Sequence, residues 1–133
     1  MYANPANAAK TYRDSEAHHV IDSDDAYGLI QKLLGRLIGC VGVARHALGN
    51  DDIASKGEQI GKAIEILSLL QVALDYSHNR QLAENLANLY DYCSRQLLHA
   101  NLHNDDAILA EVVSLLREVK EAWDSIAPSD GAA

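Results

Sequence analysis

The stretch LAENLANLYDYCSRQLLHAN, residues 82–101, decides the fold class of the chain. Apolar side chains recur in it at every third or fourth position, which places Leu82, Leu86 and Leu89 on one face of an α-helix. A helix that buries one face needs a stripe of roughly three apolar positions in seven. Leucines and tyrosines extend beyond that stripe, for example at Tyr92 and Leu98. The stretch therefore predicts a helix with more apolar surface than a bundle core requires.

Three other segments have the same periodicity, and short polar stretches separate them. The expected helices cover residues 26–48, 53–76, 81–102 and 106–126. The turns contain GNDD at 49–52, SHNR at 77–80 and HNDD at 103–106, and Asp24 or Asp25 is expected to cap the first helix. Because such short connections join antiparallel neighbours, the sequence predicts an all-α, up-down four-helix bundle.

The two ends of the chain lack this periodicity. We expect residues 1–23 to form a flexible N-terminal arm with room for one short helix, residues 24–127 to form the bundle, and residues 128–133 to be a disordered tail. The N-terminus has no basic stretch followed by an apolar one, and the longest apolar run, residues 37–44, is far shorter than the ~20 residues that cross a bilayer. We therefore expect a cytoplasmic protein that does not insert into membranes.

Composition narrows the classes of partner. Of the 133 residues, 48% are apolar, and the formal net charge is -8. A surface of this charge repels the phosphates of nucleic acids, so we expect no nucleic-acid partner. The two cysteines, Cys40 and Cys93, lie inside apolar helical patterns and not in a CxxC pair. This placement predicts reduced, buried thiols.

The six histidines invite a metal-site interpretation. His99 and His103 are four residues apart, but they stand at a helix end, where we expect them to face solvent. A di-iron bundle requires two Glu-x-x-His motifs on facing helices and two further glutamates, whereas the chain has one such motif, Glu16 to His19, in the arm. We therefore expect no metal and no cofactor.

Motifs of catalysis are also missing from the sequence. The chain has neither a Gly-x-Ser-x-Gly motif nor a phosphate-binding Gly-rich loop, so we do not expect an enzyme. His46, near the end of the first expected helix, leaves one alternative: histidine phosphotransfer domains are also four-helix bundles and use an exposed histidine. A second alternative is a self-associating bundle, in which the surplus apolar surface closes a homodimer.

Glycines and aromatic residues mark two further features. Gly35 and Gly39 interrupt the first helix at a cost of up to ~1 kcal/mol each, which predicts the close approach of a neighbouring backbone, either from the bundle or from a bound helix. Tyr90 and Tyr92 are two residues apart and point in different directions, so at least one of them lies near a groove or the surface. Trp123 continues the buried stripe of the last helix and is expected in the core.

The second half of the chain carries a more specific pattern. LDYSHNRQLAENLANLYDYCSRQLLHANLHND (74–105), followed by EVVSLLREVKEAW (111–123), resembles the flagellin export chaperones of the FliS family. In that family Leu-Asp precedes a short turn, then L-A-x-N-L-x-x-L-Y-D-Y and L-x-x-A-N follow, and a tryptophan stands near the end of the last helix. Upstream, HHVIDSDDAYGLIQKLLGRLIGC (18–40) is similar to the family's opening, and Tyr12 stands where the family has an N-terminal tyrosine.

The resemblance implies a function and also has local departures. Members are four-helix bundles of the cytoplasm that bind the disordered C-terminal segment of flagellin, prevent its premature polymerisation and deliver it to the export gate of the flagellar type III apparatus, without a cofactor. In this chain Ala26 replaces the family's proline at the helix start, Leu34-Gly35-Arg36 replaces Tyr-Asp-Gly, and Asn79-Arg80 replaces a Gly-Gly turn. These changes bear on groove contacts more than on the fold.

The expected binding site is an apolar groove for flagellin. The residues that we expect to line it are Leu34, Ile38, Leu70, Leu86, Tyr90 and Leu116. An empty groove would expose apolar surface to water, which favours a cover in the free protein. By the resemblance, Tyr12 in the arm is the expected cap, and flagellin would displace it.

Overall fold

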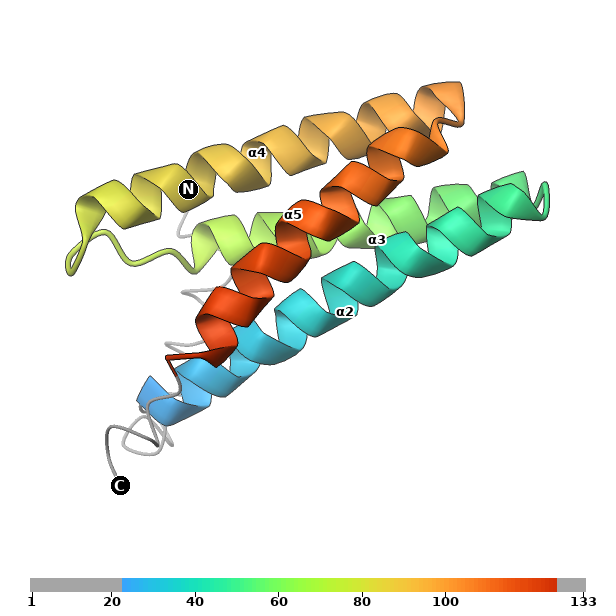
Figure 1. The fold of residues 1–133 in the computed structure, drawn as a ribbon. Coiled ribbons are helices and arrows are strands. Elements are labelled where there is room, and N and C mark those ends of the chain that lie inside the picture. The colour runs from blue at the N-terminus through green and yellow to red at the C-terminus, as the bar shows by residue number, and fades with distance from the viewer. Residues whose placement is uncertain (1–22, 127–133) are drawn as a thin grey trace.

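The computed structural model describes residues 23–126, and this range contains four helices and no strand. The helices are α2 (Ser23–Gly49), α3 (Ile53–Val72), α4 (Arg80–His103) and α5 (Asp106–Asp124) (Figure 1). Each corresponds to one of the four segments expected from the apolar periodicity. The prediction of an all-α fold is confirmed.

The helices form an antiparallel bundle in which each contacts its neighbours along the chain. Contacts between α2 and α5 close the ring. Figure 1 shows that both short turns, α2 to α3 and α4 to α5, lie at one end of the bundle, whereas the longer connection from α3 to α4 lies at the other end. We call the first the two-turn end and the second the linker end, with the linker defined as residues 73–79.

Polar side chains terminate the helices at the two-turn end. The carboxylate of Asp52 caps α3 by accepting a hydrogen bond from the backbone N–H of Ser55 at 3.1 Å. Asn104 ends α4 in the left-handed conformation (φ 53°), which asparagine adopts more readily than most residues, and Asp105 at once caps α5. The predicted turn at HNDD is confirmed, and its two central residues end α4 and begin α5.

The linker end differs from expectation, because α3 ends at Val72 and not near residue 76. Asp75 explains the early stop: its carboxylate accepts hydrogen bonds from the backbone N–H and the hydroxyl of Ser77, a local turn that competes with the helix. Asn79 then caps α4 by accepting from the N–H of Leu82 at 3.0 Å. At the other terminus, α2 already includes Asp24, so the expectation that residue 24 or 25 caps it is wrong.

One apolar cluster fills the centre of the bundle, and all four helices contribute to it. It is built chiefly from leucine, isoleucine, valine and alanine, as a chain without phenylalanine requires. Cys40 and Cys93 belong to this cluster as free cysteines, and the expectation that both are buried is confirmed. Burial raises the pKa of the Cys93 thiol to about 11, so it stays protonated and is a poor nucleophile.

Two polar contacts fasten the two-turn end. The Arg45 guanidinium makes a bidentate contact with the Asp106 carboxylate, at 2.9 and 3.0 Å, and so joins α2 to the start of α5. Lys56 is only 3% exposed, and its ammonium donates to the backbone oxygen of Asn101 at 2.8 Å and to the side-chain oxygen of Asn104 at 2.6 Å. The buried lysine thereby ties α3 to the C-terminal end of α4, where helix carbonyls lack partners of their own.

Helix α2 is long and apolar enough, by length and composition alone, to cross a membrane from Ala26 to Gly49. The core helix of a folded bundle meets the same test. Here Leu34, Leu37 and Val41 of α2 are fully buried against the other helices. Packing inside the bundle therefore accounts for one stripe of α2, whereas Leu29 and Val43 of the same helix are 53% and 50% exposed.

Candidate functional site

The described residues form a cavity of about 200 Å³ at the linker end of the bundle, and it is open to solvent on one side. The linker and the first half of α4 form most of its wall, and α2, α3 and α5 each add one residue, Ile30, Leu70 and Trp123. The apolar and aromatic lining residues are Ile30, Leu70, Ala73, Leu74, Leu82, Ala83, Leu86, Tyr90 and Trp123. An apolar hollow of this kind is a binding-site candidate, because its walls lose contacts that a guest would restore.

The sequence of α4 explains its side of the cavity. Leu82, Leu86 and Tyr90 follow one another at intervals of four residues and therefore lie in one row along the helix. Ala83 lies beside this row and, like Ala73 of the linker, has too small a side chain to fill the space.

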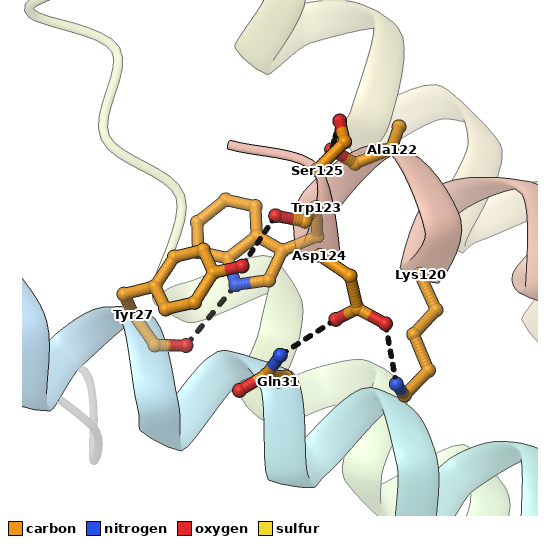
Figure 2. Close-up of polar contacts among 7 residues, drawn as sticks. All are labelled: Tyr27, Gln31, Lys120, Ala122, Trp123, Asp124 and Ser125. Carbon is orange, nitrogen blue, oxygen red and sulfur yellow. Dashed lines mark hydrogen bonds and ion pairs between the residues drawn. The ribbon is translucent and has the colours of Figure 1, made fainter. Parts of the chain in front are cut away.

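Trp123 forms part of the cavity wall, and contacts with Tyr27 hold it in position. Its indole stacks on the ring of Tyr27 with centroids 5.1 Å apart and planes 13° from parallel. The two residues also exchange hydrogen bonds, from the Tyr27 hydroxyl to the backbone oxygen of Trp123 at 2.6 Å and from the indole N–H to the backbone oxygen of Tyr27 at 3.0 Å (Figure 2). The pair, which we call the aromatic clasp, fixes the end of α5 on the start of α2.

Polar side chains beside the clasp strengthen this junction. The Asp124 carboxylate accepts from the Gln31 amide at 2.8 Å and from the Lys120 ammonium at 2.7 Å (Figure 2). The Lys120 ammonium, by its hydrogen bond, lowers the pKa of Asp124 below its ordinary value. This side of the cavity is therefore braced by several contacts between α2 and α5.

Tyr90 is the most deeply placed polar group of the cavity. The side chain is 3% exposed, and among residues 23–126 its hydroxyl has no hydrogen-bond partner. Burial raises the pKa of the phenol to about 12, so the hydroxyl remains a donor at physiological pH. A buried hydroxyl without a partner is uncommon in folded proteins and requires an explanation.

The rim of the cavity is polar and belongs to the linker. Asp75, His78 and Asn79 line it there. Hydrogen bonds from Ser77 hold the pKa of Asp75 below its ordinary value, and the imidazole of His78 lies 3.6 Å from the Asp75 carboxylate. The mouth of the cavity therefore carries a negative charge at neutral pH.

The residues that the sequence suggested for a groove fall into three groups. Leu70, Leu86 and Tyr90 line the cavity together. Ile38 lies on α2, half-buried against the core. Leu34 and Leu116 are fully buried in the core cluster, out of reach of a partner in this conformation. Tyr12 lies outside the described residues.

Several lining residues were not chosen from the sequence. The four-residue spacing from Leu82 to Leu86 and Tyr90 was a usable signal for the α4 row. Trp123 was expected in the core, and it is half-buried, with one face on Tyr27 and a share of the cavity wall. Trp123 and Tyr27 are 96 residues apart, and no local sequence pattern links such positions. Only the tertiary structure shows that Trp123 forms part of the cavity wall.

Other candidate groups do not form sites within the described range. His99 and His103 are exposed, as expected, with ring centroids 4.4 Å apart, and no group of three or more metal-binding side chains occurs among residues 23–126. His46 is exposed in the last turn of α2, with its ring nitrogen 3.1 Å from the Asn50 amide. No neighbouring backbone approaches Gly35 or Gly39, so the expected close helix contact is not formed by this bundle.

Comparison with known proteins identifies the family. Residues 6–130 match the family model described as flagellar protein FliS. The chain is 39% identical to the flagellar secretion chaperone FliSB of Pseudomonas aeruginosa over 126 residues, which cover 95% of this chain and 98% of that protein. It is 36% identical to the flagellar secretion chaperone FliS of Salmonella typhimurium over 124 residues, or 92% of each chain. The Vibrio cholerae chaperone of the same name is 30% identical over 119 residues, 90% of this chain and 88% of its own.

These matches span nearly the whole chain, bundle and flanking residues alike, and they confirm the resemblance seen in the L-A-x-N-L-x-x-L-Y-D-Y pattern of α4. The relatives are chaperones and not enzymes, in agreement with the expectation that the chain catalyses no reaction. The chain belongs to the FliS family of flagellar secretion chaperones.

Proposed function

We propose that this protein binds the disordered C-terminal segment of flagellin in the cytoplasm, prevents its premature polymerisation and delivers it to the export gate of the flagellar type III apparatus. The observation that supports this function best is the cavity, in which Leu70, Leu86 and Tyr90 meet beside exposed apolar residues. The family's role in flagellar secretion supplies the client.

The bound segment gives up conformational entropy, so its affinity depends on covering a large apolar area. Leu82 at the start of α4 lines the cavity and is 53% exposed, so it extends the apolar surface of the cavity to the outside of the bundle. An amphipathic segment that docks on this surface can place side chains in the cavity and along the helix. A segment held in this way keeps its own apolar side covered and cannot join a filament.

Tyr12 is proposed as the cap of the apolar surface in the free protein. Ser23, where α2 begins, is eleven positions further along the chain, and a stretch of that length reaches up to about 36 Å when extended. Ile30, two turns along α2, already lines the cavity, so the site is within reach. Hydrogen exchange of residues 1–23 should increase when the flagellin segment is added, and unchanged exchange would contradict the cap.

A matched pair of substitutions on α4 tests the proposed function. Leu82 lines the cavity and is 53% exposed, whereas Leu102 lies at the opposite end of the same helix and is 77% exposed. We expect Leu82→Gln to weaken binding of the flagellin C-terminal segment roughly tenfold or more, which is the effect of losing one buried leucine side chain. Isothermal titration calorimetry measures this change, with Leu102→Gln as the control for exposure and composition.

The same measurements separate the alternatives. A wild-type chain without affinity for the segment contradicts the chaperone function. Transfer of phosphate to His46 from a phosphorylated receiver domain would instead support the phosphotransfer alternative, which has no support in the family match. Light scattering that shows a dimer dissociated by Leu82→Gln would support the self-associating alternative.

A further inference from the structure

The size of the cavity defines the kind of group that it can hold. Its volume of about 200 Å³ exceeds the roughly 150 Å³ of an apolar protein cavity that admits a benzene ring. The walls are leucines, alanines and the indole of Trp123, which suit the face and edge of an aromatic ring. One aromatic side chain fits this space, and most of its contacts would be apolar.

The hydroxyl of Tyr90 adds a polar requirement. It belongs to a lining residue that is 97% buried by accessible area, since 3% is exposed, and it has no partner within residues 23–126. A guest that closes the cavity without offering an acceptor would leave this donor buried and unsatisfied, at a cost in free energy. A guest ring with an acceptor atom at its far end removes that cost.

We propose that the cavity receives one tyrosine side chain from the bound segment, whose ring fills the space and whose phenolic oxygen accepts a hydrogen bond from the Tyr90 hydroxyl. This inference rests on the proposed function and specifies the side-chain chemistry of the same site. Trp123, held by Tyr27 in the aromatic clasp, supplies a fixed aromatic wall for the incoming ring.

The charge at the rim of the cavity indicates which side chains suit the positions next to that tyrosine in the bound segment. Asp75 stays ionised because Ser77 donates to its carboxylate, and the chain as a whole carries a net charge of -8. Arg80, the nearest arginine in sequence, is engaged with Glu84 at 3.5 Å and with the ring of Tyr76. A segment with a basic side chain close to the tyrosine therefore complements this surface better than an acidic one.

The chemistry of the cavity can be tested without flagellin, by titrating the full chain with p-cresol and with toluene. The readouts are the NMR signals of the Trp123 indole N–H, unique in this chain, and of the Ala83 backbone N–H. We expect p-cresol to bind roughly threefold to tenfold more tightly than toluene, the effect of one neutral hydrogen bond. Tyr90→Phe should abolish this preference, whereas the control Tyr92→Phe, which loses a surface contact to Glu111, should retain it. Equal binding of the two compounds, or a preference that survives Tyr90→Phe, overturns the inference.

A double-mutant cycle then tests the guest. Replacing the tyrosines of the flagellin C-terminal segment by phenylalanine should weaken its binding to the wild-type chain roughly threefold to tenfold, and should have no effect on binding to Tyr90→Phe. The wild-type segment should also displace p-cresol. A segment that binds with full affinity but leaves p-cresol in place overturns the tyrosine assignment and leaves the chaperone function intact. A segment that does not bind at all refutes the proposed function itself, and p-cresol binding shows that the chain was folded.

Residues 1–22 provide the alternative source of a tyrosine. These residues contain Tyr2 and Tyr12, and replacing each by phenylalanine in the full chain measures their contribution. A preference for p-cresol that neither replacement changes supports a guest as the source. If either replacement alters p-cresol binding while the flagellin tyrosines contribute nothing, the occupant is the chain's own arm and the assignment to the guest is overturned.

Discussion

Replacing Lys56 by methionine should lower the unfolding free energy of the bundle by about 2 kcal/mol. The ammonium makes two hydrogen bonds, to Asn101 and Asn104, and each bond from a charged donor contributes about 1.5–3 kcal/mol. Methionine keeps the apolar stem of the side chain in place but removes the donor on which the oxygens of Asn101 and Asn104 depend. The loss is partly offset, because the folded protein no longer has to remove an ammonium from water, which costs several kcal/mol.

Urea denaturation followed by circular dichroism measures the difference in unfolding free energy, and a thermal scan should show a fall of about 8 °C for a chain of this length. Lys62→Met is the matched control, since Lys62 lies on the same helix, is 46% exposed and is 3.8 Å from Glu58. Its loss should cost less than about 0.5 kcal/mol. Combining Lys56→Met with Asn104→Ala should give a non-additive change, because the two residues share one hydrogen bond.

If Lys56→Met and Lys62→Met unfold at the same urea concentration, the reasoning about the buried ammonium is refuted. Additive effects of the Lys56 and Asn104 substitutions would refute the narrower claim that their contact carries part of the stability.

Three further results are expected. Trp123→Phe should keep the stack on Tyr27 but lose the indole hydrogen bond, lowering the unfolding free energy by about 1 kcal/mol in urea denaturation; an unchanged value would show that the bond contributes nothing. Tyr90→Phe should leave stability unchanged or raise it by up to about 1 kcal/mol, since its hydroxyl has no partner to lose, and a marked fall in melting temperature would contradict this. Hydrogen bonds from Arg45 lower the folded-state pKa of Asp106 below 3.8, so this pair contributes stability that is present above that pH and is lost as pH falls through the lowered pKa. Asp106→Asn should therefore reduce the loss of melting temperature on acidification, and an identical pH profile would contradict that expectation.

The fold followed from the sequence because its signals are local. Apolar spacing located each helix, and Asp52, Asn79, Asn104 and Asp105 mark helix ends through contacts with residues at most a few positions away. The end of α3 was misplaced because the Asp75–Ser77 turn competes with an apolar pattern that continues to residue 76. Propensity and periodicity alone do not decide such a competition.

The cavity was only partly predictable, for a different reason. Leu34 and Leu70 are both apolar, lie on broad helix faces and belong to the core cluster, yet only Leu70 also lines the cavity. Which face of a helix meets a neighbour depends on how the helices rotate and cross, and no short-range pattern encodes that. Lys56 shows the same limit, since its acceptors lie 45 and 48 residues away.

The unequal ends of the bundle have a mechanical consequence. At the two-turn end, the tight Asn104–Asp105 turn and Lys56 hold α4 in place. Its N-terminal end is connected to α3 by the longer, seven-residue linker 73–79. At the linker end one hydrogen bond among residues 23–126, from the Gln71 amide to the backbone oxygen of Ala87 at 2.9 Å, joins α4 to α3. We therefore expect α4 to separate from the bundle first at this end, where Leu82 and Leu86 line the cavity. The separation would then decrease along α4 towards the two-turn end, and a long guest segment could enter at the linker end while the rest of the bundle stays packed.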